Sequence, residues 1–258
     1  MLWWLETQQT FVIALVVFAF CYLLAIVILI AAAVLSAHPI AGKVNATTPA
    51  MLTPLGVITG LVIAFLAARV WSNFDHAQAF VTQEASEIRT AVLLSEVLPA
   101  DVRTNIRNDI KQYLQFVDAE DWPAMLRGET NIRRPPPGLP EALIASLSFD
   151  PQHAGQQTAQ RDIAHAIEQA LRARRNRILL SEASISPPQW IVILVLDALI
   201  LLTIAMLHVG RHATTAVSLF IFSTAIGACL VILMINDRPF NTGGVIVERA
   251  PLHEVAFQ

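Results

Sequence analysis

Apolar residues gather in four long runs, and the rest of the chain is mostly polar. The runs cover residues 11–35, 52–71, 191–208 and 213–235. A helix of about 20 apolar residues crosses the roughly 30 Å hydrocarbon core of a bilayer, and each run is close to or above that length. The pattern therefore predicts four transmembrane helices, the last two forming a hairpin around the short link at 209–212.

Between the second and third runs, apolar positions follow a helical period. After Trp71 they recur at three- and four-residue steps as far as Val97, with no Gly or Pro in between. This predicts one long helix from Pro54 to about Val97 that extends beyond the bilayer. Pro99 is expected to end it and to open the next helix, whose apolar face continues to Val117.

Two segments divide the rest of this region. Asp121-Trp122-Pro123 is expected to stop the helical pattern. Arg133–Gly138 is expected to form a stiff, non-helical loop because it contains three consecutive prolines. Two further helices are expected after it, at 141–147 and at about 156–183.

These elements predict an all-α integral membrane protein with a helical domain between its second and third spans. The expected divisions are 1–71 with two spans, 72–189 as the helical domain, 190–235 with two more spans, and 236–258 as a C-terminal tail. No internal repeat and no strand-rich region is visible in the sequence.

Basic residues near the ends of the spans predict the orientation, because cytoplasmic flanks carry an excess of Lys and Arg. The termini and the helical domain share one side, and the domain has a basic run before the third span: Arg172, Arg174, Arg175 and Arg177. The other side has only Lys43 and Arg211. We therefore expect both termini and the domain in the cytoplasm. The excess of Arg over Lys favours a bacterial genome, and hence a multi-pass protein of the inner (plasma) membrane.

The composition argues against several classes of protein. Only 14% of the residues are charged and the net charge is −3, whereas binding to nucleic acid needs a basic face. The sequence has no glycine-rich phosphate loop and no Cys or His pair at metal-ligand spacing. Asp75-His76 comes closest to an acid–base pair, but adjacent positions on a helix do not face each other. We expect no enzymatic activity, no cofactor and no metal site.

Asp197 is the one carboxylate inside an apolar run. Its insertion costs about 3 kcal/mol, which the surrounding Leu, Ile and Val residues offset at about 0.3–0.6 kcal/mol each. Two interpretations stay open. Asp197 is either a permeation or proton site, or a buried hydrogen-bond partner for a Thr or Ser of a neighbouring span.

Two motifs have counterparts in a known family. The second run, from Thr53-Pro54 through Gly60-Leu61 to Arg69-Val70-Trp71 and Asp75, resembles the bestrophin pore helix. That helix has a Pro near its start, a Gly two turns on, and an Arg-Trp-Trp with an aromatic residue and an acid at its cytoplasmic end. Ile235–Gly243 resembles the bestrophin Asn-Pro-Phe-Gly segment with two residues inserted.

Most of the chain is similar to a bacterial bestrophin-like membrane protein family, distantly related to the bestrophin anion channels. The resemblance rests on four spans, a long helix after the second span, and three short motifs: Glu84-Ala85, Trp122-Pro123 and Arg238-Pro239-Phe240. It implies a homo-oligomeric, pentameric channel for small inorganic ions in a lipid bilayer, with the second span lining the pore.

In bestrophins, a hydrophobic neck uses three residues spaced four apart on that span. The matching residues here are Thr53, Val57 and Leu61, which share one helix face. A ring of such faces forms an apolar constriction that gates by dewetting. The family has bulkier Ile and Phe at these positions, so we expect a wider or differently gated neck. The calcium-binding acidic run of animal bestrophins is missing apart from Asp237, so we expect no calcium gating.

The same residues have structural interpretations. Thr53, Val57 and Leu61 pack against neighbouring helices if Gly56 and Gly60 act as a close-packing pair.

The charges near the span ends have two interpretations as well. Arg69 pairs with Asp75 or extends to the headgroups; otherwise it forms an anion site. Asp237 and Arg238 either clamp the chain where it leaves the membrane or contribute to selectivity.

Three functions follow from these patterns. The first is a passive ion channel assembled from copies of the chain. The second is a non-conducting membrane scaffold or sensor whose helical domain binds a partner. The third is a small transporter that uses Asp197 as its coupling site.

Overall fold

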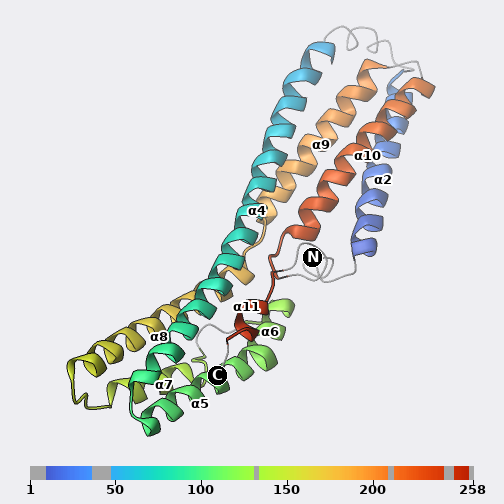
Figure 1. Ribbon diagram of the computed structural model, residues 1–258. Coiled ribbons are helices and arrows are strands. Elements are labelled where there is room, and N and C mark those ends of the chain that lie inside the picture. The colour runs from blue at the N-terminus through green and yellow to red at the C-terminus, as the bar shows by residue number, and fades with distance from the viewer. Residues whose placement is uncertain (1–9, 37–47, 131–133, 209–211, 241–246, 256–258) are drawn as a thin grey trace. The chain divides into compact units, whose positions relative to one another are not determined.

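The computed structural model describes residues 10–36, 48–130, 134–208, 212–240 and 247–255. Within these residues every regular element is a helix. The chain divides into two compact units, residues 1–71 with 184–237, and residues 72–183 with 238–258. The chain passes from the first unit to the second within one continuous helix, α4 (Figure 1).

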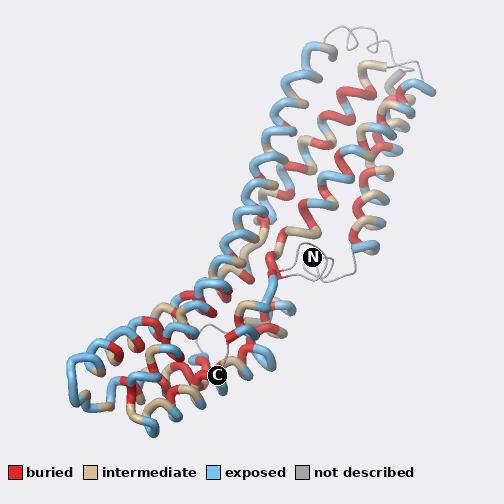
Figure 2. Tube along the Cα trace, viewed as in Figure 1, coloured by how far each residue is buried: buried red, intermediate tan, exposed pale blue. Residues whose placement is uncertain are grey.

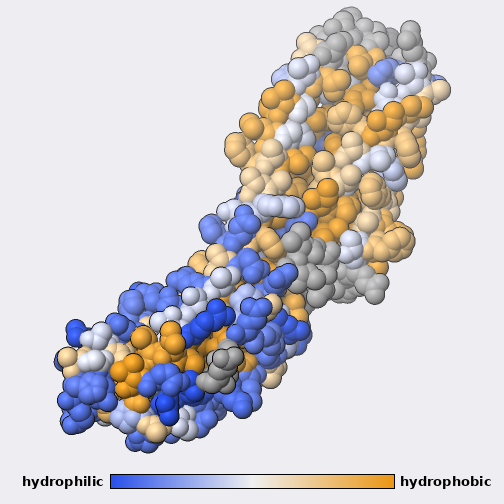
Figure 3. All heavy atoms as spheres, viewed as in Figure 1, coloured by the Kyte–Doolittle hydropathy of each residue, from blue (hydrophilic) through white to orange (hydrophobic). Residues whose placement is uncertain are grey.

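Four helices that contribute to the first unit are long and apolar enough to cross a membrane. They are α2 (Thr10–Ser36), α4 (Thr48–Leu94, in its first part), α9 (Pro187–Leu207) and α10 (His212–Asn236). Hydrophobic side chains cover much of the face of these helices that is seen in Figure 3. The prediction of an all-α chain with four such helices is confirmed.

The four helices are buried to different extents. α2, α9 and α10 pack directly against one another, most extensively α2 with α10. In the most apolar window of α4, 11% of the residues are buried, against 44% for α9 and for α10. Figure 2 shows the exposed positions along α4. A large part of this span is therefore uncovered in a single chain.

The interior of the first unit consists of two separate hydrophobic clusters. The first cluster contains Ile13, Val17, Cys21, Leu66, Val70, Ile185, Trp190, Ile193, Ile226, Leu230, Leu233 and Met234. The second cluster contains Ala25, Ile28, Ala32, Ile200, Leu201, Ile204, Ala205 and Leu219. Each cluster joins several helices, so burial of apolar area holds the bundle together at two levels.

The second unit is a helical domain with one hydrophobic core. Besides the rest of α4, its elements are η1 (Ser95–Val97), α5 (Ala100–Phe116), the π-helical turn η2 (Val117–Asp121), α6 (Trp122–Arg127), α7 (Leu139–Leu147), α8 (Ala154–Ser181) and α11 (Ala250–His253). On α8, Ile163, Ile167 and Ile178 point into the core, as their spacing predicts. The segment expected as a C-terminal tail, 236–258, also contributes to this core through Phe240 and Leu252.

α4 begins earlier than predicted. The helix starts at Thr48 rather than at Pro54, runs to Leu94, and continues as η1 to Val97. Pro49 suits this start because the first turn of a helix needs no N–H donor from it. Pro54 therefore lies inside the helix, where the carbonyl four residues before it lacks its usual partner.

The predicted stop at Asp121-Trp122-Pro123 is wrong. The π-helical turn carries α5 into α6, which ends at Gly128 with a φ of 66°. A π turn inserts an extra residue and so shifts the register of the helix. Asp121 and Trp122 are buried as a result. Pro123 comes just after the π-helical turn, in the first residues of α6.

Some residues on which the sequence-based expectations depend lie outside the described residues. They are Lys43 and Arg211, used for the orientation, and Arg133 of the proline-rich loop.

Candidate functional site

One face of α4 carries the three residues expected at a neck. Thr53, Val57 and Leu61 are all exposed, Val57 by 64% and Leu61 by 53%. The same four-residue step continues to Phe65, which is 66% exposed, and to Arg69, which is also exposed. These five residues form what we call the exposed row of α4. The spacing alone would have added Phe65 to the expected neck.

The opposite face of α4 holds the helix against the bundle. Leu66 and Val70 are buried in the first cluster, and Val62 packs against it. Thr59 is also buried. In one chain, α4 therefore uses one side for packing and leaves the exposed row free to meet lipid, a second copy of the chain or a water-filled lumen.

Gly56 and Gly60 do not serve close packing within the chain. A Cβ atom built on either glycine meets nothing within 4 Å. Ala64 and Ala68 continue the same four-residue step and are exposed. This row of small residues lies beside the exposed row, because positions three apart are neighbours on a helix.

Arg69 contacts the start of α9. Its Nη1 donates a hydrogen bond to Gln189 Oε1 at 3.2 Å. The same Gln189 oxygen accepts hydrogen bonds from the backbone N–H and the hydroxyl of Ser186, the N-cap residue of α9. Arg69 thus links α4 to the cap of α9. Asp75 is exposed on α4, and no described residue forms a hydrogen bond or ion pair with it, so the pairing of Arg69 with Asp75 is not formed in this structure.

Asp237 joins the end of α10 to the start of α9. Its side chain is buried, and Oδ1 accepts a hydrogen bond from the backbone N–H of Ile185 at 2.7 Å. Arg238 follows it and is half-buried. Phe240 is buried in the second unit, where its ring meets Trp122 edge-on at a centroid distance of 5.5 Å. Asp237 is thus fixed at the start of α9, and Phe240 is fixed in the core of the second unit.

Asp197 lies in the middle of α9 and is 1% exposed. Neither of its carboxylate oxygens has a hydrogen-bond partner among the described residues. The hydrogen bond to a Thr or Ser of a neighbouring span that one interpretation expects is therefore not formed in this structure.

A buried ion pair in the second unit was not expected from the sequence. Arg177 of α8 is fully buried, and its Nε donates to Glu84 Oε2 at 2.7 Å while its Nη2 donates to Glu84 Oε1 at 3.1 Å. The hydroxyl of Tyr113 also donates to Glu84. Arg174 forms a second two-point pair with Asp121, at 2.7 and 2.9 Å.

These contacts shift two pKa values. Burial raises the pKa of Tyr113 well above its ordinary value, and the neighbouring Glu84 carboxylate raises it further. Burial alone lowers the pKa of Arg177, but the Glu84 carboxylate more than offsets this, so that the net shift is upward. Both shifts keep the protons in place at neutral pH. The cluster is therefore a fixed structural network rather than a proton-transfer site.

A signal for this network was present in the sequence. Arg174 and Arg177 continue the three- and four-residue spacing of Ile163, Ile167 and Ala170 on α8, which is the spacing of its core face. Both arginines belong to the basic run before the third span on which the predicted orientation depends. Their buried carboxylate partners mean that they contribute little to that argument.

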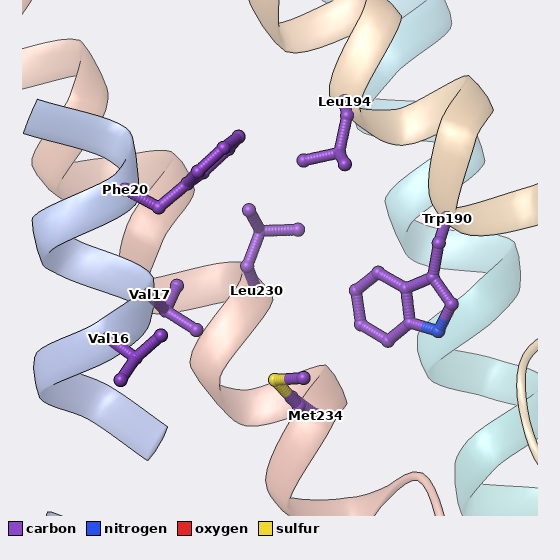
Figure 4. Close-up of a pocket in the computed structure, with 7 residues that line it drawn as sticks. All are labelled: Val16, Val17, Phe20, Trp190, Leu194, Leu230 and Met234. Carbon is purple, nitrogen blue, oxygen red and sulfur yellow. The ribbon is translucent and has the colours of Figure 1, made fainter. Parts of the chain in front are cut away.

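An apolar cavity of about 200 Å³ lies between α2, α9 and α10 (Figure 4). Its lining is Val16, Val17, Phe20, Trp190, Leu194, Leu230 and Met234. The benzene ring of Trp190 faces the other labelled side chains, and its nitrogen points away from them. The lining offers no polar group that could orient a substrate. Among the described residues, no three His, Cys, Asp or Glu side chains are grouped as metal ligands.

Comparison with known proteins gives one match. The family model of the Bestrophin-like domain matches residues 7–252, nearly the whole chain. No curated protein and no solved structure matches the chain.

Proposed function

The chain belongs to the bestrophin-like family, and from this premise we propose that it is one subunit of an ion channel. In the proposed assembly, five identical chains surround a single pore lined by α4, and ions cross it passively. The second unit and both termini face the cytoplasm, and the channel lies in the plasma membrane. The proposal includes no enzymatic step, no cofactor and no metal.

The exposed row of α4 is the observation that carries the proposal. Val57, Leu61 and Phe65 stack along one helix face and are each more than half exposed in the single chain. When several copies of this face meet around an axis, they form a narrow apolar ring. Water leaves such a ring readily, so that it closes to ions without any moving plug.

The neighbouring row of small residues supports an assembly of this kind. Gly56, Gly60, Ala64 and Ala68 let another helix approach closely, which is how small residues act between spans. Because the row of small residues and the exposed row are side by side on α4, one can face the adjacent subunit while the other faces the axis.

A pore needs more than one chain. Four helices enclose no lumen wide enough for hydrated ions, and head-to-tail contacts between identical subunits close into rings. Arg69 stands at the end of the exposed row and donates a hydrogen bond to Gln189. A ring of such guanidinium groups favours anions.

Two measurements on the full-length protein test this proposal. Native mass measurement in detergent is expected to show an oligomer of more than two chains. Reconstitution into planar bilayers is expected to give currents, with a reversal potential in asymmetric salt that shows a preference for anions. A monomer or dimer would contradict a shared pore. A stable oligomer without current would favour a scaffold.

A further inference from the structure

The two hydrophobic clusters of the first unit are separated at the same level on all four helices. The flanking members, or apolar residues packed on them, are Cys21 and Leu24 on α2, Leu55 and Val62 on α4, Ile193 and Ile200 on α9, and Leu219 and Ile226 on α10. On α10, the partly buried Phe222 lies between the two flanking residues and packs against both clusters. On three helices, the buried residue inside this break is polar: Thr59, Asp197 and Ser223. On α2, Cys21 borders the break.

Thr59, Asp197 and Ser223 form what we call the polar layer. Their exposed fractions are 4%, 1% and 0%. Each lies near the middle of its span, so the layer sits near the middle of the membrane. Intramembrane ionisable residues are unfavourable there, and they mark ion or proton sites more often than structural ones.

Contacts between the helices support this alignment. Cys21 of α2 and Ile193 of α9, one turn before Asp197, belong to the same hydrophobic cluster. On α10, a Cβ built on Gly227, one turn after Ser223, would lie 3.6 Å from the Cys21 sulfur. Both α9 and α10 therefore approach α2 at Cys21, which brings the levels of Asp197 and Ser223 together.

The polar layer has no internal hydrogen bonds. The Thr59 hydroxyl, both Asp197 oxygens and the Ser223 hydroxyl have no hydrogen-bond partner among the described residues. Hydroxyls inside helices commonly donate to the carbonyl four residues earlier. Thr203 and Thr224, on the same helices as Asp197 and Ser223, do so at 2.7 Å each. The oxygens of the polar layer are thus available to a ligand, and leaving them unpaired is unfavourable.

The chemistry of these oxygens limits the ligand. Carboxylate and hydroxyl oxygens suit hard cations. One carboxylate balances one positive charge, so a monovalent cation leaves the layer neutral, whereas a divalent cation leaves an uncompensated charge in apolar surroundings. An anion would be repelled by the carboxylate.

We propose that the polar layer is a binding site for a small monovalent cation, which exchanges with the Asp197 proton. As the cation binds, the Asp197 carboxylic acid releases its proton to water. The carboxylate and the hydroxyls of Thr59 and Ser223 then replace part of the cation's hydration shell. Cys21 of α2 is the titratable neighbour of Asp197 beside the polar layer. The site lies within one subunit and does not depend on the proposed pore.

Labelling with dicyclohexylcarbodiimide, a hydrophobic reagent that reacts with protonated carboxyl groups, tests the proposal. Full-length protein is labelled in lipid nanodiscs, and modification of Asp197 is followed by peptide mass spectrometry. Sodium ion is expected to protect Asp197 from labelling, while choline at equal ionic strength is not. Protons compete for the carboxylate, so half-protection should need about tenfold more sodium for each unit by which the pH falls.

Two variants identify the ligands, and a third serves as the control. Ser223→Ala and Thr59→Val remove one oxygen each and should raise the sodium concentration for half-protection about tenfold or more. Thr224→Val removes a hydroxyl that lies at the same level of α10 but already has hydrogen-bond partners. This variant should leave the sodium concentration for half-protection unchanged. The proposal would be overturned if sodium and choline protected Asp197 equally. It would also be overturned if all three variants needed the same sodium concentration for half-protection.

Discussion

Arg177 and Glu84 lie 93 residues apart in the chain and form a fully buried, two-point ion pair. The guanidinium of Arg177 also stands over the ring of Trp122 at 5.7 Å, and Trp122 in turn contacts Phe240. Glu84, Trp122 and Phe240 each come from one of the three short motifs of the family resemblance. These motifs therefore meet around one arginine in the core of the second unit.

Glu84→Gln is expected to destabilise the protein strongly. It leaves the Arg177 charge buried without its main partner, and breaking a buried pair in this way costs about 3–5 kcal/mol. Thermal unfolding of the full-length protein measures the loss. Arg172→Ala is the control on the same helix, because Arg172 meets Glu168 only at an exposed 3.8 Å contact. Its effect should stay within about 0.5 kcal/mol, and equal losses in the two variants would contradict the assignment.

Tyr113 makes the second unit sensitive to alkali. Its pKa is raised above the ordinary 10.0 by burial and by Glu84. Above pH 10.0 the unfolded chain loses the phenolic proton while the folded protein keeps it, so stability is present below that pH and falls as the pH rises. Tyr113→Phe loses one hydrogen bond but cannot titrate. Its melting temperature should lie below that of the natural protein at neutral pH, and the difference should narrow above pH 10. A constant difference would exclude this titration.

Asp109→Asn is expected to raise the melting temperature at neutral pH. Burial and the nearby charge of Glu141 raise the pKa of Asp109 above 3.8, so its ionised form is disfavoured in the folded protein. The stability that this shift provides is present below pH 3.8 and is lost as the pH rises through the folded pKa. The gain from the substitution should therefore disappear in acid. Asp101→Asn, on the first turn of the same helix, should show no such gain.

Leu61→Ala is expected to raise single-channel conductance if α4 lines the pore. Removing three carbons from each subunit widens the apolar ring and makes it easier to wet. Leu15→Ala on α2 is the matched control, because Leu15 is exposed to a similar extent, 56% against 53%. Bilayer recordings of both variants, with the oligomeric state checked, distinguish the two faces. Unchanged conductance for Leu61→Ala would remove Leu61 from the neck.

Asp237→Ala should loosen the junction between α9 and α10. It leaves the buried N–H of Ile185 without its acceptor, which costs about 1–3 kcal/mol. Asp237→Asn keeps an acceptor oxygen at the same place and should cost less. Thermal unfolding of both variants in detergent provides the comparison. If the two variants lost equal stability, the hydrogen bond to Ile185 would not be the reason for the burial of Asp237.

Much of the fold was predictable from local pattern. The spans follow from runs of apolar residues, since hydrocarbon demands about 20 of them in sequence. The helices of the second unit follow from three- and four-residue spacing, as Ile163 and Ile167 show. The spacing also placed Thr53, Val57 and Leu61 on one face, and the structure leaves that face exposed. The π-helical turn before Trp122 was missed, because a proline after turn residues usually ends a helix.

The sequence alone determined that the chain is helical, that four of its segments suit a membrane, and that one face of the second span is apolar. These properties depend on neighbours along the chain. Only the tertiary structure decided that Glu84 meets Arg177 and that Thr59, Asp197 and Ser223 are buried on three different helices. Such pairings depend on how far one helix slides and turns against another, and no spacing within a single helix encodes that register.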